Sequence, residues 1–147
     1  MKTSRLIAAL LAIFLLGGSA AAGEITIAVI GNPGSPIKSL SLSQVMSLYT
    51  GRQDSAFDSF SAVPLDQPNG SDLRKEFYLS VTGQSETQIN AFWARLAFSG
   101  RALPPRPMSD SAAVIKRVAS DVHAIGYVPR EMVTKDVAVI CDIKIKN

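Results

Sequence analysis

The stretch that decides the fold is residues 63–78, V-P-L-D-Q-P-N-G-S-D-L-R-K-E-F-Y. It is expected to run as a short strand, to turn over Asp66–Gly70 and to enter a helix at Ser71. The first turn of a helix carries backbone N–H groups without partners inside the helix, and such groups can hold an anion. Two further segments belong with it: residues 92–105, F-W-A-R-L-A-F-S-G-R-A-L-P-P, and residues 124–128, A-I-G-Y-V.

Strands and helices alternate along the rest of the chain. Short β-branched runs predict strands, and apolar residues at helical spacing behind a capping residue predict helices. This alternation predicts an α/β domain with a mainly parallel central sheet flanked by helices. The expected strands are 25–30, 61–65, 125–128 and 137–145, and the expected helices begin after Ser41, Ser71, Ser85 and either Ser109 or Asp110.

Several apolar side chains are expected in the core. The helix after Ser41 places one buried face at i, i+3, i+4 and i+7, with Leu42, Val45, Met46 and Tyr49 on it. Aromatic side chains on the later helices are expected to pack rather than to bind a ligand, and these are Phe77, Phe92, Trp93 and Phe98.

The N-terminal residues 1–22 read as a secretory signal peptide. Lys2 and Arg5 precede the uncharged apolar run Leu6–Leu16, and Ala20–Ala22 supplies a small-residue cleavage site. The run is too short for a spanning helix, which needs about 20 apolar residues. We therefore expect cleavage after Ala22, a mature domain of residues 23–147 without a membrane anchor, and a periplasmic location.

Composition argues against several classes of function. The full chain has 15 basic and 12 acidic side chains, and removing Lys2 and Arg5 leaves nearly equal numbers, which argues against nucleic-acid binding. Cys141 is the sole cysteine, so it is buried, free or paired between chains, with burial in a strand favoured. His123 reads as a turn residue, and no motif for a metal, a cofactor or a catalytic nucleophile is present, so the sequence predicts no metal, no cofactor and no enzyme.

The chemical candidate is therefore the turn that leads into the helix at Ser71. Its expected ligand-binding residues are Asn69, Gly70, Ser71, Asp72 and Arg74. The Ser71 hydroxyl and the N–H groups of the first turn could face an anion, and Arg74 could add a charged contact. Ser71 would equally serve as an ordinary helix cap.

Together with residues 39–52, S-L-S-L-S-Q-V-M-S-L-Y-T-G-R, the quoted segments resemble one lobe of the phosphate-binding proteins that serve ABC importers. Those proteins have two lobes of the type 2 periplasmic-binding-protein fold, and this chain is long enough for one. In that family the turn carries an Arg and then Gly-Ser-Gly-Thr. Here Ser71 is retained, but Asp72 and Leu73 replace the next Gly and the Thr, and the Arg position falls near Gln67.

The resemblance implies two alternative functions. The first is a solute-binding protein for phosphate or another small oxyanion, with an ABC permease or another periplasmic protein as partner. The second is a non-catalytic periplasmic accessory or interaction domain that has lost the ligand site. A homodimer across the cleft surface would supply the second wall that a single lobe lacks.

Overall fold

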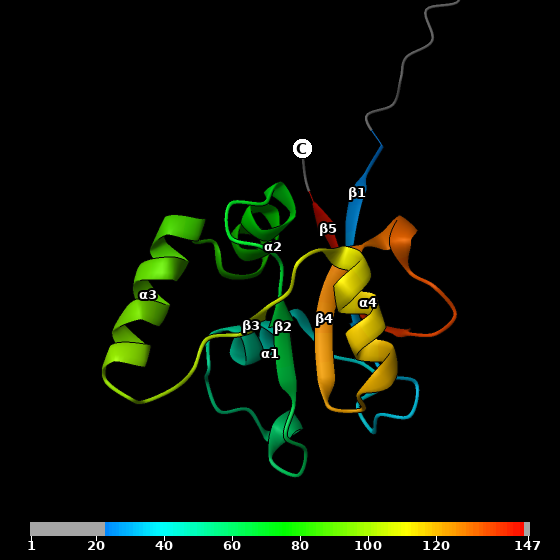
Figure 1. Cartoon of the computed structure of the whole chain (residues 1–147), viewed down its shortest axis with the longest axis horizontal. Coiled ribbons are helices and arrows are strands. Elements are labelled where there is room, and N and C mark those ends of the chain that lie inside the picture. Colours follow the sequence, from blue (N-terminus) through cyan, green and yellow to red (C-terminus); the bar gives the residue numbers. More distant parts are fainter. Residues whose placement is uncertain (1–22, 146–147) are drawn as a thin grey trace, which may run out of the picture.

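The computed structural model describes residues 23–145, so the expected signal peptide lies outside the described residues. The chain alternates between strands and helices (Figure 1). The strands are β1 (Ile25–Gly31), β2 (Val63–Asp66), β3 (Arg106–Pro107), β4 (Ala124–Pro129) and β5 (Ala138–Ile145). The helices are α1 (Leu42–Tyr49), α2 (Asp72–Thr82), α3 (Glu86–Phe98) and α4 (Ser111–Ser120), with the short 3-10 helices η1 (Ser55–Phe57) and η2 (Arg130–Met132).

The strands form one mixed sheet in the order β3-β2-β4-β1-β5. Strand β2 runs parallel to β3 and to β4, whereas β1 runs antiparallel to both β4 and β5. The predicted α/β domain with a central sheet flanked by helices is therefore confirmed. The parallel part of the sheet consists of β3, β2 and the central strand β4. The antiparallel part consists of β4, β1 and β5, and it contains the first and last strands of the described domain.

From Ile27 onward strand β1 is buried on both faces, as its almost wholly apolar sequence predicts. Ile27 and Val29 pack into a core shared with α1, α2 and α3, whereas Ala28 and Ile30 pack into a second core beneath α4. Figure 1 shows α4 alongside β4, and α3 at one end of the molecule beside α2. The sheet thus separates a larger helical layer from the single helix α4.

The helix starts follow the capping residues expected from the sequence. Ser41 and Gln44 form a capping box at α1, and Ser85 heads a second one at α3. Asp110, rather than Ser109, caps α4 through the amide of Ala113. Each cap satisfies an N–H group that the helix leaves open, which stabilises a helix by about 1 kcal/mol.

Two residues expected in the core are exposed. Leu42 is 46% exposed because it is the first residue of α1, and Phe98 is 97% exposed at the last residue of α3. Trp93 is buried as predicted, with 6% of its surface exposed. Strand β2 begins at Val63 instead of Ser61, and β3 lies in a proline-containing segment that is not among the expected strands.

Candidate functional site

The turn between β2 and α2 has the local geometry that its sequence predicts. Gly70 has φ +85°, a conformation that glycine adopts without a steric penalty. Ser71 then caps α2, and its hydroxyl accepts a hydrogen bond from the Arg74 N–H at 3.3 Å. The Ser71 side chain therefore serves as a cap in this structure.

Arg74 lies inside the site rather than in solvent. It is 7% exposed, and its guanidinium lies between two carboxylates. Its Nε is 3.1 Å from Asp66 Oδ2, and its Nη1 is 2.7 Å from Glu86 Oε1. Nη1 also donates to Asn69 Oδ1 at 3.1 Å. The positive charge that an anion would need is thus already paired within the chain.

Asp66 anchors this arrangement from the end of β2. Its carboxylate is 4% exposed and accepts hydrogen bonds from Tyr127, Tyr78, Arg74 and the backbone of Gln67. Burial, together with the negative charge of Asp66, raises the pKa of both tyrosines. Both phenols therefore stay protonated and act as donors. A buried charge is costly unless it is paired and hydrogen-bonded, and Asp66 satisfies both conditions.

Glu86 occupies the position in which this turn could hold an oxyanion. Its Oε1 accepts a hydrogen bond from the Gly70 N–H at 2.7 Å and another from Arg74 Nη1 at 2.7 Å. Burial favours the neutral acid, but the hydrogen bonds from Gly70 and Arg74 outweigh it and lower the pKa of Glu86. Glu86 is therefore an ionised carboxylate bound by Gly70 and Arg74, two of the five residues that were expected to bind phosphate.

The structure brings four of the five predicted residues together. Asn69, Gly70, Ser71 and Arg74 surround the turn, and Asn90 of α3 joins them by donating to Asn69 Oδ1 at 3.0 Å. Asp72 is different, because its fully exposed side chain contacts only Lys75, at 3.9 Å, among the ion pairs of the described residues. Asp72 therefore does not share the surroundings of Arg74.

A cavity of about 240 Å³ lies beside the Arg74 guanidinium. Asn69, Asn90 and Trp93 contribute to its lining, together with prolines of the segment before α4. The Trp93 indole is buried, and its Nε1–H has no hydrogen-bond partner among the described residues. The cavity thus adjoins the predicted site, but two of the donors of that site point to Glu86 instead.

The sequence did not identify Asp66, Glu86, Asn90 or Tyr127 as members of this cluster. Asp66 ends a strand ahead of the turn, and Tyr127 lies in A-I-G-Y-V. Both residues therefore belong to segments that the sequence analysis connects with the fold, residues 63–78 and 124–128. Glu86, in the first turn of α3, lies in none of these segments. No local spacing could reveal it, because its contact with Gly70 depends on how α3 folds back on α2.

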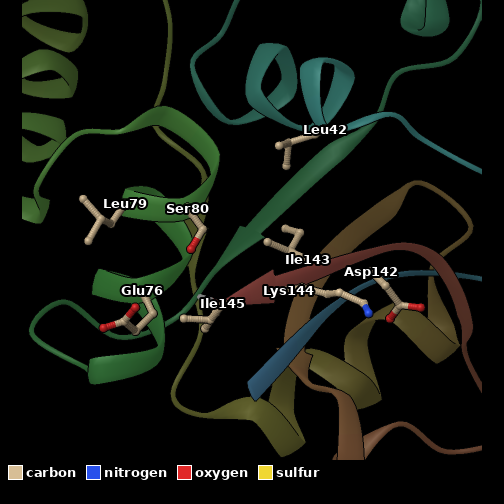
Figure 2. Close-up of a pocket in the computed structure, with 8 residues that line it drawn as sticks. All are labelled: Leu42, Glu76, Leu79, Ser80, Asp142, Ile143, Lys144 and Ile145. Carbon is tan, nitrogen blue, oxygen red and sulfur yellow. The ribbon is translucent and has the colours of Figure 1, made fainter. Parts of the chain in front are cut away.

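A second hollow lies on another part of the surface (Figure 2). It is a groove of about 410 Å³ between α2 and β5. Figure 2 shows Leu79 and Ser80 on α2, with Ile143, Lys144 and Ile145 on β5. Its lining does not include any of the predicted site residues.

His123 lies in the turn before β4, as predicted, where its ring stacks on Phe60 with the ring centres 4.9 Å apart. Within residues 23–145, no three His, Cys, Asp or Glu side chains are grouped to hold a metal ion. None of the helices in that range combines the length and the apolar character that a membrane crossing requires.

Three solved structures of similar fold are described as phosphate-transport or phosphate-binding proteins. A phosphate ABC transporter substrate-binding protein from Clostridium perfringens, with bound phosphate, superposes with a TM-score of 0.63 at 21% identity, over 80% of this chain and 44% of that one. An ABC-type phosphate transport receptor from Vibrio cholerae gives 0.62 at 16% identity, over 80% and 46%. The chain has the fold of half a phosphate-binding protein. The resemblance read from the sequence is confirmed at this level.

A third structure, of a possible phosphate binding protein from Planctomyces limnophilus, gives a TM-score of 0.53 at 9% identity, over 73% of this chain and 36% of that one. The chain thus spans less than half the length of each of these three proteins. No protein-family model matches the sequence, and no curated protein matches it significantly. At these identities the likeness establishes the fold and leaves the ligand to be argued from the site.

Proposed function

We propose that the mature protein is an exported, non-catalytic accessory or interaction domain, built on a single phosphate-binding lobe whose anion position is filled by its own Glu86. One observation carries this proposal: Glu86 Oε1 lies 2.7 Å from both the Gly70 nitrogen and Arg74 Nη1. A carboxylate oxygen is negatively charged and accepts charge-assisted hydrogen bonds from these donors, as an oxygen of phosphate does.

Displacement of Glu86 by free phosphate is unfavourable. The carboxylate is attached to the same chain, so its effective concentration at the turn corresponds to millimolar or more. A bound phosphate would also lie near the Asp66 carboxylate, which contacts Arg74 at 3.1 Å. Separating Glu86 from Arg74 would also remove one of the two carboxylates that neutralise the buried guanidinium and leave Arg74 paired with Asp66 alone.

A second candidate function is the binding of phosphate or another small oxyanion after Glu86 moves away. The cavity beside Arg74 favours it, because about 240 Å³ gives room for a small anion next to Asn69 and Asn90. A lone lobe would leave such a ligand open to solvent, where salt screening weakens charged contacts. We expect millimolar affinity at best for this function, about 4.1 kcal/mol at 1 mM.

Export and partners belong to the same proposal. The pattern in residues 1–22 supports cleavage after Ala22 and a periplasmic location. The solved structures of similar fold are described as ABC transporter proteins, which supports a permease or another periplasmic protein as partner. An accessory domain would present its surface to that partner without carrying a ligand.

The two functions are separated by a thermal-shift series on the mature protein with phosphate, sulfate, molybdate and chloride at matched ionic strength. Ligand binding to the native state raises its apparent stability by RT ln(1 + [L]/Kd). The accessory function predicts equal melting temperatures in all four salts at millimolar concentration. A phosphate-specific rise at micromolar concentration would overturn it and establish solute binding.

A further inference from the structure

The strand β5 ends the sheet with part of its edge uncovered. Among the described strands it pairs with β1 alone. The segment before α1 reaches this edge at one point, where the Leu40 N–H donates to the Ile140 carbonyl at 2.8 Å. Beyond that point, residues 142–145 line the groove of Figure 2, and on this side of β5 no described strand pairs with them. An open edge of this kind is a template for pairing with another strand.

Exposed apolar side chains surround the same edge. Leu79 of α2 is 53% exposed and Leu42 of α1 is 46% exposed, and both line the groove next to Ile143 and Ile145. Apolar groups gathered at an open edge mark an interaction surface more strongly than single exposed ones do.

The charges on this edge are complementary to a second copy of the same edge. Asp142 and Lys144 flank Ile143 and are both exposed. If two β5 strands pair antiparallel about Ile143, Asp142 faces Lys144 of the second copy, and Lys144 faces its Asp142. Opposite charges placed directly across two strands stabilise the pairing. Their present partners, Arg130 and Glu24, are exposed and hold them weakly.

We propose that the β5 edge forms a symmetric dimer, in which two copies of residues 141–145 pair antiparallel about Ile143 and join both sheets into one. A dyad at Ile143 is the one that places Asp142 opposite Lys144 of the second copy. The apolar side chains of both copies close the groove between α2 and β5. This dimer differs from one across the ligand cleft, and it does not depend on whether the lobe binds an anion.

Analytical ultracentrifugation of the mature protein tests the dimer. We expect it to be mainly dimeric at about 100 μM, which requires a micromolar Kd. Asp142→Lys places like charges opposite each other and should raise the dimer Kd about tenfold. The double variant Asp142→Lys with Lys144→Asp restores opposite charges and should restore dimerisation, whereas the control Asp58→Lys, on an exposed carboxylate of another surface, should leave the Kd unchanged.

A cysteine pair tests the register directly. The proposed dyad places Cys141 opposite residue 145 of the second copy, at a Cα separation that permits a disulfide. Ile145→Cys should therefore form a disulfide-linked dimer on oxidation, and the same variant with Cys141→Ser should not. Within one extended strand the two positions are too far apart to join. A wild-type protein that is monomeric at 100 μM would overturn the proposal, as would a charge-swapped double variant as weak as Asp142→Lys.

Discussion

Arg74 Nη1 and Glu86 Oε1 are 2.7 Å apart, and this contact joins the first turn of α2 to the first residue of α3. The Gly70 N–H completes the surroundings of the same carboxylate oxygen at 2.7 Å. The strand–turn–helix that could receive an external anion therefore receives an internal one. This contact connects the fold of the chain to its proposed function.

Glu86 should make stability depend on pH. Its pKa is lowered in the folded protein, so its contribution is present above the pKa of an unfolded Glu, about 4.3, and is lost as pH falls through the folded value. Glu86→Gln should lower the free energy of unfolding by about 1.5–3 kcal/mol at pH 7. Urea titrations between pH 7 and pH 3 should show this difference shrinking toward low pH. A difference that stays constant with pH would mean that the charge of Glu86 does not stabilise the fold. The control variant is Glu76→Gln, because Glu76 lies on the exposed side of α2.

Trp93 should be a major contributor to the helical side of the core. It is 6% exposed, and a side chain added at Gly51 would meet its ring. Trp93→Ala should cost about 3–5 kcal/mol, because it leaves a large cavity. Phe98→Ala is the matched control, since Phe98 is 97% exposed and its loss should change stability by less than about 0.5 kcal/mol. Equal losses for the two variants in urea denaturation would contradict this packing.

Gly126 should resist substitution because α4 crosses β4 closely at this residue. A Cβ built at Gly126 collides with Val114 Cγ1. Gly126→Ala should therefore destabilise the protein by about 1–3 kcal/mol. Val114→Ala removes the colliding methyl group, so the double variant should lose less than the sum of the two single losses. Additive losses in a double-mutant cycle would exclude this contact as the cause.

Ser71 should matter for stability and not for anions. Its hydroxyl caps α2 through the Arg74 N–H, so Ser71→Ala should lower the free energy of unfolding by about 0.5–2 kcal/mol. The response of the melting temperature to phosphate should be the same in both proteins. A smaller phosphate response in Ser71→Ala than in the wild type would instead assign the hydroxyl to a ligand.

The sequence predicts the local features of this fold better than the long-range ones. Capping residues and helical spacing locate the α-helices α1 to α4 of residues 23–145, because both signals act within a few residues. Strand direction is not encoded that way, so the antiparallel placement of β1 against β4 and β5 was not foreseen. The sequence did not predict the two-residue strand β3. Its segment is rich in proline, which is found in extended connections as well as in edge strands, and contains Pro104, Pro105 and Pro107.

In the candidate site, too, the sequence predicts the local features and not the long-range contacts. The turn, its Gly70 and its cap Ser71 were located from a contiguous segment. The state of Arg74 was not, because its two carboxylate partners come from β2 and from the start of α3. Asp72, which drew attention as a charge at an anion site, is fully exposed and lies apart from that cluster. Only the folded chain shows that Glu86 is the carboxylate at the turn.

The most direct test of the central claim is a calorimetric titration of phosphate into the mature wild type and into Glu86→Ala at matched ionic strength. If Glu86 holds the anion position, the wild type gives no binding heat up to millimolar phosphate. Glu86→Ala frees the Gly70 N–H and Arg74 Nη1 and should bind phosphate with a Kd of about 1 mM, equivalent to 4.1 kcal/mol. Saturation of the wild type at micromolar phosphate would contradict the account, and so would a Glu86→Ala variant that stays folded and silent.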